Sequence, residues 1–360
     1  MVERDYMERA LFHAARGAGR TSPNPLVGAV VVSADGVVLG QGFHQRAGEA
    51  HAEVHALAEA GARARGATLY CTLEPCCHQG RTGPCVSRIV DAGVARVVAA
   101  VEDPNPAVRG RGFAFLRERG VAVDVGLAAE RAVTLNQPFF TLMREGRPFV
   151  ILKAATSLDG RIAEAPGRRT TLTSAAANRH AHRVRAEVDA IGVGSGTILS
   201  DDPELTARGA FRERPLARVI FDRRLRTPPG ARVLSTPDAG PVIIVTSAAA
   251  AATAALRAPL EARGAHIEVA ADRTLGAALQ RLADRQIESL LLEGGGSVHA
   301  AAWDEGLVDY VRLYVTPHTL GAGGVPLLPD RSFSSADLHH RRVATLGPDV
   351  LIEGYVHGTR

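Results

Sequence analysis

The stretch TLEPCCHQGRTGPC occupies residues 72–85, and HAE precedes it at residues 51–53. The apolar run ATLYCTL, which overlaps its start, predicts a strand, and the spacing of apolar residues predicts helices over 51–65 and 85–92. A histidine, a glutamate and two separated cysteines are thereby assigned to the ends of neighbouring elements. This succession of helix, strand and helix predicts an α/β domain whose sheet is covered by helices.

His51, Cys76 and Cys85 are residue types that bind zinc in catalytic sites. One imidazole and two thiolates supply three ligands and leave the fourth position of the ion for water, whose pKa zinc lowers toward neutrality. Glu53 follows His51 by two residues, so it can lie beside the metal without binding it and transfer a proton to a substrate. The pattern predicts a zinc-dependent deaminase site with Glu53 as the catalytic residue, and it disfavours a purely structural zinc.

The sequence spacing of the cysteines does not by itself decide whether Cys76 or Cys77 is a ligand. In the general pattern of nucleobase deaminases two residues separate the cysteine ligands, whereas here Cys76 and Cys77 are adjacent and Cys85 follows much later. Cys76 directly follows Pro75, as that pattern requires, and is therefore preferred. Cys71 lies within the predicted strand and is interpreted as a small core residue.

Two domains are expected from the length of 360 residues and from a polar break in the pattern at residues 144–148. Before the break, a predicted helix over 5–16 and a hairpin around 34–36 lead into alternating helices and strands. After the break, strands and helices alternate again. We therefore predict an α/β protein with a first domain over residues 1–145 and a second over residues 146–360.

Two glycine-rich turns follow predicted strands in the second half, GVGSGT at residues 192–197 and EGGGS at residues 293–297. A strand, a glycine turn and a helix can cradle phosphate on exposed backbone amides. Neither turn has the Gly-x-Gly-x-x-Gly spacing of a dinucleotide-binding fingerprint, so each alone is more typical of a plain turn. The second half is therefore not expected to be a conventional Rossmann domain.

Bulk properties favour a globular enzyme over a nucleic-acid or membrane protein. The formal net charge is +4 at pH 7, and the arginines are dispersed instead of forming a basic stripe. The charged segment at residues 1–10 is unlike a secretory signal, and no stretch has the length and apolar character of a membrane span. All four cysteines lie between residues 71 and 85, which favours metal binding over a disulfide framework. We expect a cytoplasmic protein without nucleic-acid or membrane partners.

The front half resembles the deaminase half of the bifunctional riboflavin-biosynthesis deaminase–reductases. The resemblance rests on SPNPLVGA (22–29), GFH (42–44), HAEVHAL (51–57), TLEPCCHQGRTGPC (72–85) and DPNP (103–106). It implies a cytidine-deaminase-like three-layer sandwich, one zinc ion held by His51, Cys76 and Cys85, and Glu53 as the proton shuttle. It also implies substrate contacts from Asn24, His44, Arg81, Asp103 and Asn105.

The second half resembles the reductase half of the same family. The matching motifs are RPFV (147–150), SLDGRIA (157–163), DDP (201–203) and LLEGGGS (291–297). The resemblance implies a dihydrofolate-reductase-like α/β domain that binds NADPH. The implied cofactor-binding residues are Ala155, Thr197, Asp201, Gly294, Gly295, Gly296 and Ser297. The implied contacts to the substrate are Lys153, Arg185, Leu205, Arg208 and Glu293. The sequence departs from the family at Arg169 and Thr171, where a serine and a tryptophan are usual, so the effect of these positions on reduction stays open.

The resemblance implies hydrolytic deamination of 2,5-diamino-6-(5-phosphoribosylamino)pyrimidin-4(3H)-one to 5-amino-6-(5-phosphoribosylamino)uracil, followed by NADPH-dependent reduction of the ribose to a ribityl chain. The substrate is thus a small pyrimidine nucleotide. A zinc-dependent deaminase of transfer RNA with an unrelated second domain is the alternative, which the long insertion between the cysteines and the dispersed charge disfavour. A zinc-binding scaffold without catalysis is a third. The sequence does not decide the oligomeric state (a homo-oligomer included), substrate channelling between the domains, or the preference for NADPH over NADH.

Overall fold

The computed structural model describes residues 2–78, 83–329 and 333–358. The described chain divides into two compact units, one ending at Glu145 and the other beginning at Gly146. The division lies within the polar stretch at residues 144–148. Each unit has its own sheet and its own core, and each is described by itself.

The sheet of the first unit has, within the described residues, the strand order β2-β1-β3-β4-β5. The strands are β1 (Gly28–Val32), β2 (Val38–Phe43), β3 (Thr68–Cys71), β4 (Arg96–Ala99) and β5 (Ala122–Val125). β1 pairs antiparallel with both β2 and β3, and β3, β4 and β5 are parallel. The hairpin predicted around residues 34–36 is therefore confirmed as the connection between β1 and β2.

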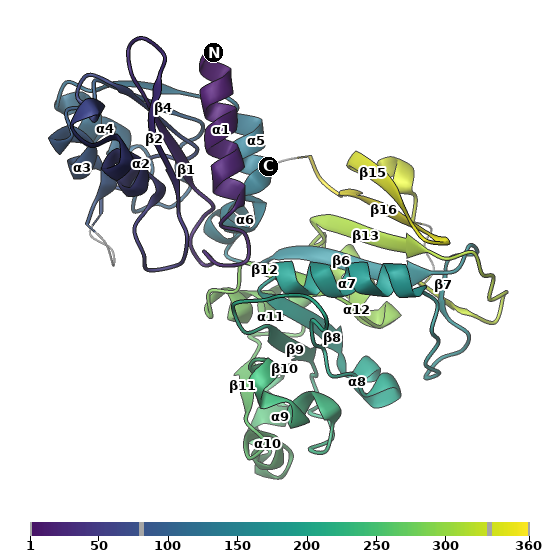
Figure 1. Ribbon diagram of the computed structural model, residues 1–360. Helices are drawn as coiled ribbons and strands as arrows, with labels where there is room; N and C mark the ends of the chain where they lie inside the picture. The colour runs from purple at the N-terminus through teal and green to yellow at the C-terminus, as the bar shows by residue number, and fades with distance from the viewer. Residues whose placement is uncertain (1, 79–82, 330–332, 359–360) are drawn as a thin grey trace. The chain divides into compact units, whose positions relative to one another are not determined.

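Helices cover both faces of this sheet, as predicted (Figure 1). They are α1 (Glu3–Ala15), α2 (Ala52–Ala60), α3 (Cys85–Asp91), α4 (Arg111–Glu118), α5 (Ala129–Leu135) and α6 (Gln137–Glu145). Successive residues of a strand point to opposite faces, so Ala29 and Val31 pack in the core beneath α2 and α3, whereas Val30 and Val32 pack against α1. The result is a three-layer sandwich.

The helix predicted over residues 51–65 is shorter than expected. It begins after His51 and ends at Ala60, because Gly61 adopts a φ of 56° and a ψ of −140° that no α-helix can contain. A 3₁₀ turn over Gly61–Ala64 follows. His51 thus lies immediately before the first turn of α2. Its backbone is extended, and this conformation sets the direction of its side chain.

Two glycines of β2 bring α2 close to the sheet. A Cβ atom at Gly40 would lie 2.2 Å from the carbonyl oxygen of Ala56, and a Cβ atom at Gly42 would lie 2.5 Å from Cβ of His55. Real Cβ atoms do not approach other atoms so closely, so any side chain at these positions would push the helix away. This close packing sets the position of the helix whose first turn carries Glu53.

The second unit is built on a larger sheet, whose order in the described residues is β11-β10-β9-β8-β12-β6-β13-β16-β15. Its strands are β6 (Phe149–Thr156), β8 (Ala190–Gly194), β9 (Ala217–Phe221), β10 (Val242–Thr246), β11 (Ala265–Val269), β12 (Ser289–Leu292), β13 (Tyr310–Val315), β15 (His339–Leu346) and β16 (Asp349–Tyr355). Every pair from β11 to β13 is parallel, and β16 and β15 add an antiparallel edge. A small ribbon pairs β7 (Arg161–Ala163) with β14 (Val325–Pro326).

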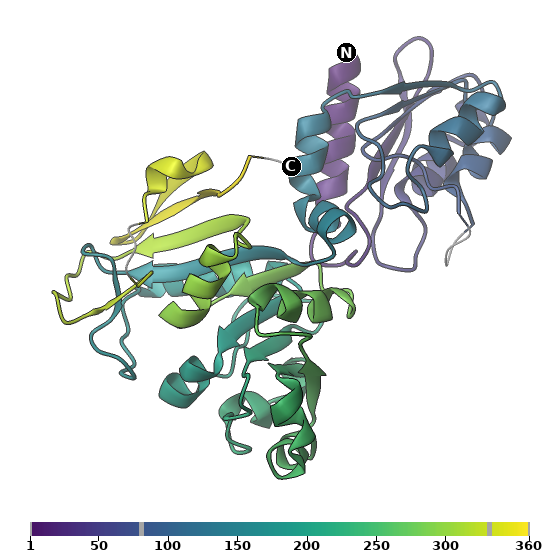
Figure 2. The same cartoon turned by 180° about the vertical axis from the view of Figure 1, so that it is seen from behind.

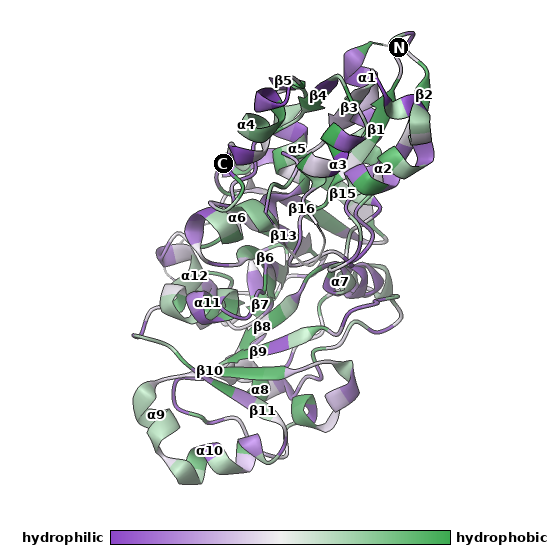
Figure 3. Cartoon of the chain, turned by 90° about the vertical axis from the view of Figure 1, so that its left-hand side faces the viewer, coloured by the Kyte–Doolittle hydropathy of each residue, from purple (hydrophilic) through white to green (hydrophobic). Residues whose placement is uncertain are grey.

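Helices lie on both faces of the second sheet as well. They are α7 (Ala175–Glu187), α8 (Ser195–Asp201), α9 (Ala248–Ala252), α10 (Ala254–Glu261), α11 (Leu275–Ala283) and α12 (Gly296–Asp304). Figure 1 shows α7 in front of the strands, and Figure 2 shows α12 on the opposite face. Ile243 packs in the core beneath α11, whereas Ile244 packs in the core with Leu260 of α10. Because both faces are buried, β8 and β10 are almost continuously apolar, as their green colour in Figure 3 shows.

Two features of the second unit were not anticipated from the sequence. The alanine-rich helix after residue 247 is interrupted at Thr253, which separates α9 from α10. Strands β11, β15 and β16 were also missed. β15 has the sequence HHRRVATL and is exposed along nearly its whole length, so it lacks the apolar alternation on which strand prediction depends.

Within the described residues, no helix has the length and apolar character required to cross a membrane.

Replacing Gly40 by Ala is expected to destabilise the first unit. The added methyl group meets backbone atoms of α2 that cannot rotate away, so the free energy of unfolding should fall by about 1–3 kcal/mol, the usual cost of overpacking. Gly230→Ala is the control, because a Cβ atom there would meet nothing within 4 Å. Thermal unfolding monitored by calorimetry measures both effects, and equal melting temperatures for the two variants would contradict the close packing of α2.

Candidate active sites

The first site gathers the three residues predicted to bind metal. His51 precedes α2, Cys76 lies in the loop after β3, and Cys85 begins α3. Nδ1 of His51 lies 3.4 Å from Sγ of Cys76 and 3.3 Å from Sγ of Cys85. The three donor atoms lie within 4.8 Å of one another. They are close enough to bind one ion together.

Cys77 does not take part in this cluster. Its sulfur faces the carbonyl oxygen of Ala107 at 3.9 Å, away from His51. The backbone amide of Cys85 is instead directed to Sγ of Cys76, at 3.4 Å. Hydrogen bonds to the Cys85 thiol and, to a smaller extent, to His51 lower the pKa of Cys76 to about 4. Of the adjacent Cys76 and Cys77, Cys76 therefore forms a thiolate more readily. The geometry favours Cys76 over Cys77 as a metal ligand.

Glu53 is buried next to the cluster, in the first turn of α2. Its side chain is 3 % exposed, and Oε2 has no hydrogen-bond partner within the described residues. Burial raises the pKa of Glu53 to about 7, against the opposing effect of His51. A carboxyl group with such a pKa can both accept and release a proton near neutrality. A buried acid with one unpaired oxygen beside three metal-binding atoms fits an open, catalytic zinc site.

The predicted substrate contacts Asn24 and His44 lie at the same site. Nδ2 of Asn24 lies 3.1 Å from Nε2 of His44, and Nδ1 of His44 lies 3.2 Å from the carbonyl oxygen of Ala50. The rings of His44 and His51 meet edge to face, with centroids 5.2 Å apart. Burial lowers the pKa of His44, so the ring is neutral near pH 7. Asn24 and His44 therefore adjoin the metal cluster and can offer hydrogen bonds to a polar ring.

Asp103 and Asn105 form a turn held by its own side chains. The backbone amide of Asn105 donates to Oδ1 of Asp103 at 2.8 Å, and the amide of Ala107 donates to Oδ1 of Asn105 at 3.0 Å. Burial raises the pKa of Asp103 to about 7. The fifth predicted contact, Arg81, lies outside the described residues.

Glu74 is a functional residue whose role the sequence did not reveal. Its buried carboxylate accepts hydrogen bonds from backbone amides of Asp103, Gly110, Gly112 and Phe113, at 2.9–3.3 Å. It thereby ties the loop that carries Cys76 to the loop that carries Asp103 and to the amino terminus of α4. Asn136 has a similar role, because its side-chain amide pairs with both the N–H and the carbonyl of Leu26, near Asn24. No motif marks Asn136 in the sequence.

The second site is a cavity of about 720 Å³ at the carboxyl ends of the parallel strands in the second unit. This edge is where open α/β sheets bind ligands. All of the predicted cofactor-binding residues line it, namely Ala155, Thr197, Asp201, Gly294, Gly295, Gly296 and Ser297. Gly294 adopts a φ of 151°, and a Cβ atom there would lie 2.9 Å from Oγ1 of Thr197. The two glycine-rich turns therefore pack against each other, which only glycine permits.

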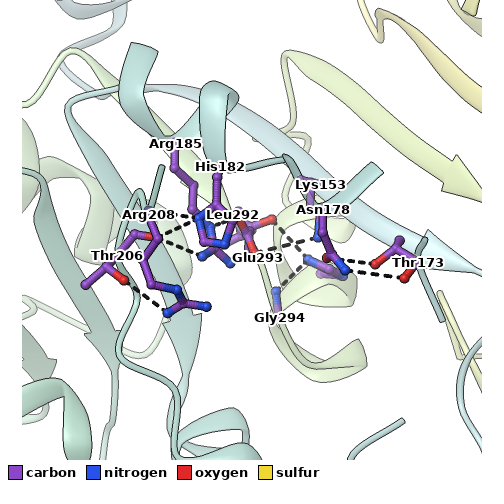
Figure 4. A network of polar contacts seen from close by, with 11 residues as sticks. Lys153, Thr173, Asn178, His182, Arg185, Thr206, Arg208, Leu292, Glu293 and Gly294 are labelled. Carbon is purple, nitrogen blue, oxygen red and sulfur yellow. Dashed lines mark hydrogen bonds and ion pairs between the residues drawn. The ribbon is translucent and has the colours of Figure 1, made fainter. Parts of the chain in front are cut away.

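A buried ion-pair cluster forms one wall of this cavity (Figure 4). Glu293 follows β12, and its carboxylate makes paired hydrogen bonds of 2.7 Å with Nε and a terminal nitrogen of Arg185. Nζ of Lys153 lies 3.7 Å from the same carboxylate. Burial alone would raise the pKa of Glu293, but the charges of Arg185 and Lys153 outweigh it and lower the pKa to about 2. Glu293 is therefore ionised, and the guanidinium of Arg185 is fully engaged.

A smaller cavity of about 410 Å³ shares Lys153, Ala155 and Asp201 with the first. Arg208, the predicted substrate contact, lines it, and so does His182, which the sequence did not single out. Arg185 and Leu205 are not among the lining residues of either cavity: Arg185 lies behind Glu293, and Leu205 is a buried core residue with a φ of 55°. Arg185 therefore acts on the cavity through Glu293.

The departures at Arg169 and Thr171 lie on a loop beside both cavities. Arg169 lines both of them, and Thr171 lines the smaller one. Five arginines, four of which the sequence analysis did not single out, also line the larger cavity. They are Arg168, Arg169, Arg223, Arg226 and Arg273. A cavity with glycine turns and several guanidinium groups is suited to a ligand with phosphate groups.

Both units match known families. Residues 1–101 match the cytidine and deoxycytidylate deaminase zinc-binding region, and residues 148–352 match the RibD C-terminal domain. The chain is similar to the riboflavin biosynthesis protein RibD of Aquifex aeolicus, at 39 % identity with 98 % of each chain covered. It is also similar to that of Bacillus amyloliquefaciens, at 42 % identity with 97 % of this chain and 95 % of the relative covered.

Solved structures agree with these relatives over the whole chain. The RibD of Acinetobacter baumannii has a TM-score of 0.85 at 36 % identity, with 97 % of each chain covered. A deaminase/reductase of Thermotoga maritima has a TM-score of 0.80 at 33 % identity and the same coverage. Its name is diaminohydroxyphosphoribosylaminopyrimidine deaminase/5-amino-6-(5-phosphoribosylamino)uracil reductase.

A zinc-type deaminase unit followed by a reductase unit defines the class of bifunctional deaminase–reductases. Within that class, the chain belongs to the RibD family of riboflavin biosynthesis enzymes. The predicted fold class and the resemblance noted in the sequence are thereby confirmed. The deaminase of nucleic acid that served as the alternative is not favoured.

Replacing Glu293 by Gln is expected to lower the free energy of unfolding of the second unit by about 3–5 kcal/mol, because Arg185 would be left buried without its counter-charge. Glu164→Gln is the control, because Glu164 pairs with Arg168 at an exposed position and the pair is worth about 0–1 kcal/mol. The measurement is chemical denaturation of both variants at pH 7. Equal unfolding midpoints would contradict the ion-pair cluster.

Glu293 also makes the stability of the second unit depend on pH in the acidic range. The folded pKa of Glu293, about 2, lies below its ordinary value of 4.5. Its contribution to stability is therefore complete above about pH 4.5 and is lost as the pH falls toward 2. Stability measured across this range should fall more steeply for the wild type than for Glu293→Gln.

Proposed function

We propose that the first unit deaminates 2,5-diamino-6-(5-phosphoribosylamino)pyrimidin-4(3H)-one by hydrolysis and that the second unit reduces the ribose of the product to a ribityl chain with NADPH. The proposal rests chiefly on the cluster of His51, Cys76 and Cys85 beside the buried Glu53, whose Oε2 has no hydrogen-bond partner in the described residues. The name of the Thermotoga maritima relative supports both substrates. They are small polar metabolites, which fits the cytoplasmic location expected from the sequence.

His51, Cys76 and Cys85 would hold one zinc ion per chain, since an imidazole and two thiolates are ligands that zinc prefers. When bound, zinc supplies a water molecule that loses its proton near neutral pH. Glu53 would take a proton from the attacking water and pass it to the pyrimidine ring nitrogen, and would then take a second proton from the added hydroxyl group and pass it to the departing amine, a role that its pKa of about 7 permits. The pyrimidine and its ribose would be held by Asn24, His44, Asp103 and Asn105, with Arg81 as a further contact.

The large cavity of the second unit would hold NADPH. Its volume and the glycine turn over Gly294–Gly296 suit a dinucleotide, whose phosphate groups would meet backbone amides. Ala155, Thr197, Asp201 and Ser297 would complete the contacts. Arg223 follows β9 and would favour NADPH over NADH by pairing with the additional phosphate. When bound, the cofactor supplies a hydride to the sugar.

The smaller cavity would hold the ribose phosphate. Arg208 presents a guanidinium to it, and Lys153 lies where the two cavities meet. Glu293 offers carboxylate oxygens to sugar hydroxyls while it neutralises Lys153 and Arg185. Leu205 would support this region from the core and Arg185 would act through Glu293. Together these side chains would orient the sugar toward the cofactor.

Product analysis by mass spectrometry tests both activities. Without NADPH, the zinc-loaded protein is expected to convert the diaminopyrimidine substrate only to the deaminated compound; with NADPH, the reduced compound should follow. Glu53→Gln should slow deamination at least about 100-fold and leave reduction of the supplied deaminated compound unchanged, because Glu53 lies in the other unit. A protein that yields neither product would contradict the proposal.

Zinc content distinguishes the two adjacent cysteines. Cys76→Ser is expected to lose bound zinc, because the substitution removes one of three ligands, whereas Cys77→Ser should retain about one zinc ion per chain. Elemental analysis after gel filtration measures both. Zinc lost from Cys77→Ser and kept by Cys76→Ser would reverse the assignment.

A further inference from the structure

His299 is a buried histidine of α12 that contacts the backbone on both sides of Glu293. The residue is 2 % exposed. Its Nε2 lies 3.1 Å from the backbone nitrogen of Gly294 and 3.2 Å from the carbonyl oxygen of Leu292. A single ring nitrogen is therefore directed at the peptide groups that flank Glu293.

The ring keeps a hydrogen bond to the backbone in either of its neutral tautomers. The N–H of Gly294 can only donate to Nε2, and the carbonyl oxygen of Leu292 can only accept from it. Burial lowers the pKa of His299 to about 4, and the nearby Lys153 acts in the same direction. The ring is therefore neutral at physiological pH.

The position of His299 is costly for stability. Nδ1 is buried and has no hydrogen-bond partner within the described part of the chain. A buried polar atom without a partner costs about 1–3 kcal/mol, which an aliphatic side chain of similar size would avoid. Stability alone therefore does not account for a histidine at this position.

The groups that His299 holds are those on which the second site depends. On one side, the Glu293 carboxylate contacts Arg185 at 2.7 Å and Lys153 at 3.7 Å. On the other side, Gly294 packs against Thr197 with no room for a side chain. Figure 4 shows Leu292, Glu293 and Gly294 at the centre of this network. A shift of the peptide between Glu293 and Gly294 would move both the carboxylate and the glycine turn.

We propose that His299 is a positioning residue of the reductase unit, whose Nε2 contacts the backbone at Leu292 and Gly294 and thereby fixes both the Glu293 carboxylate and the glycine turn over the cavity. The inference rests on the proposed reductase function for its consequence in catalysis. It does not rest on that function for the hydrogen bond itself.

Two amide substitutions separate the hydrogen bond from the bulk of the ring. Glutamine can place its oxygen near the position of Nε2, whereas asparagine is shorter and reaches only the position of Nδ1. His299→Asn is expected to lower kcat/KM for reduction by about 10- to 100-fold, the scale of effect that a misplacement of about 1 Å has on catalysis. His299→Gln should stay within about threefold of the wild type. Equal impairment of the two variants, or full activity of His299→Asn, would overturn the proposal.

Deamination by the same preparations serves as the internal control. His299 lies in the second unit, so both variants should deaminate at the wild-type rate. Reduction is assayed with the deaminated compound, and the dissociation constant of NADPH is measured separately by its fluorescence. His299→Asn should bind NADPH more weakly, because the glycine turn is no longer fixed; unchanged binding together with unchanged kcat would contradict the inference.

A spectroscopic measurement tests the hydrogen bond without any activity. In protein with ¹⁵N-labelled histidine, the signals that disappear in His299→Gln identify the ring of His299. The wild-type ring is expected to stay neutral and in a single tautomer between pH 6 and 8, because Nε2 is held by its backbone partners. A ring that takes up a second proton in this range, or that exchanges between both tautomers, would overturn the proposal even in an active enzyme, whereas an inactive wild type with a neutral ring in one tautomer would contradict only the proposed function.

Discussion

Charged groups removed from water must be given partners, and this constraint organises both units. In the second unit, Glu293 is buried at the end of β12 and is held by Arg185 from α7 and Lys153 from β6. In the first unit, the buried carboxylate of Glu74 draws backbone amides from the 103–113 segment toward the loop of Cys76. Each carboxylate joins segments that are distant in sequence, so each site exists only in the folded unit.

The surroundings of the buried acid shift its pKa in opposite directions in the two sites. Glu293 is surrounded by positive charge, its pKa is lowered to about 2, and it remains ionised, which suits a residue that anchors and orients. Glu53 lacks a partner for Oε2, its pKa is raised to about 7, and it can exchange a proton, which suits a catalytic acid and base. The difference comes mainly from the neighbours of each carboxylate, because both side chains are largely removed from solvent. The two chemistries of a deaminase–reductase thus follow from the local electrostatics of each unit.

Close packing of backbone keeps these groups in place. Gly40 and Gly42 let α2 approach β2, which positions the turn with Glu53. Gly294 lets one glycine turn approach Thr197 of the other, and His299 holds the amide of Gly294 from the opposite side. Glycine is needed at these points because a side chain would displace the neighbouring element. The reactive groups are therefore carried by elements with little freedom to move.

The sequence by itself determined the zinc-binding pattern, the succession of elements, the α/β class and the glycine turns, because these depend on local spacing and on the chemistry of single side chains. It preferred Cys76 to Cys77 only because Cys76 follows Pro75; the directions of the two side chains are decided by the loop after β3. Glu74, Asn136 and His299 carry no local signature, because their partners are backbone groups brought near by folding. The exposed strand β15 lacked apolar alternation and needed its neighbour β16 to be recognised. Tertiary structure decided which side chains face one another, and hence that Arg185 acts through Glu293 while Arg208 lines the cavity.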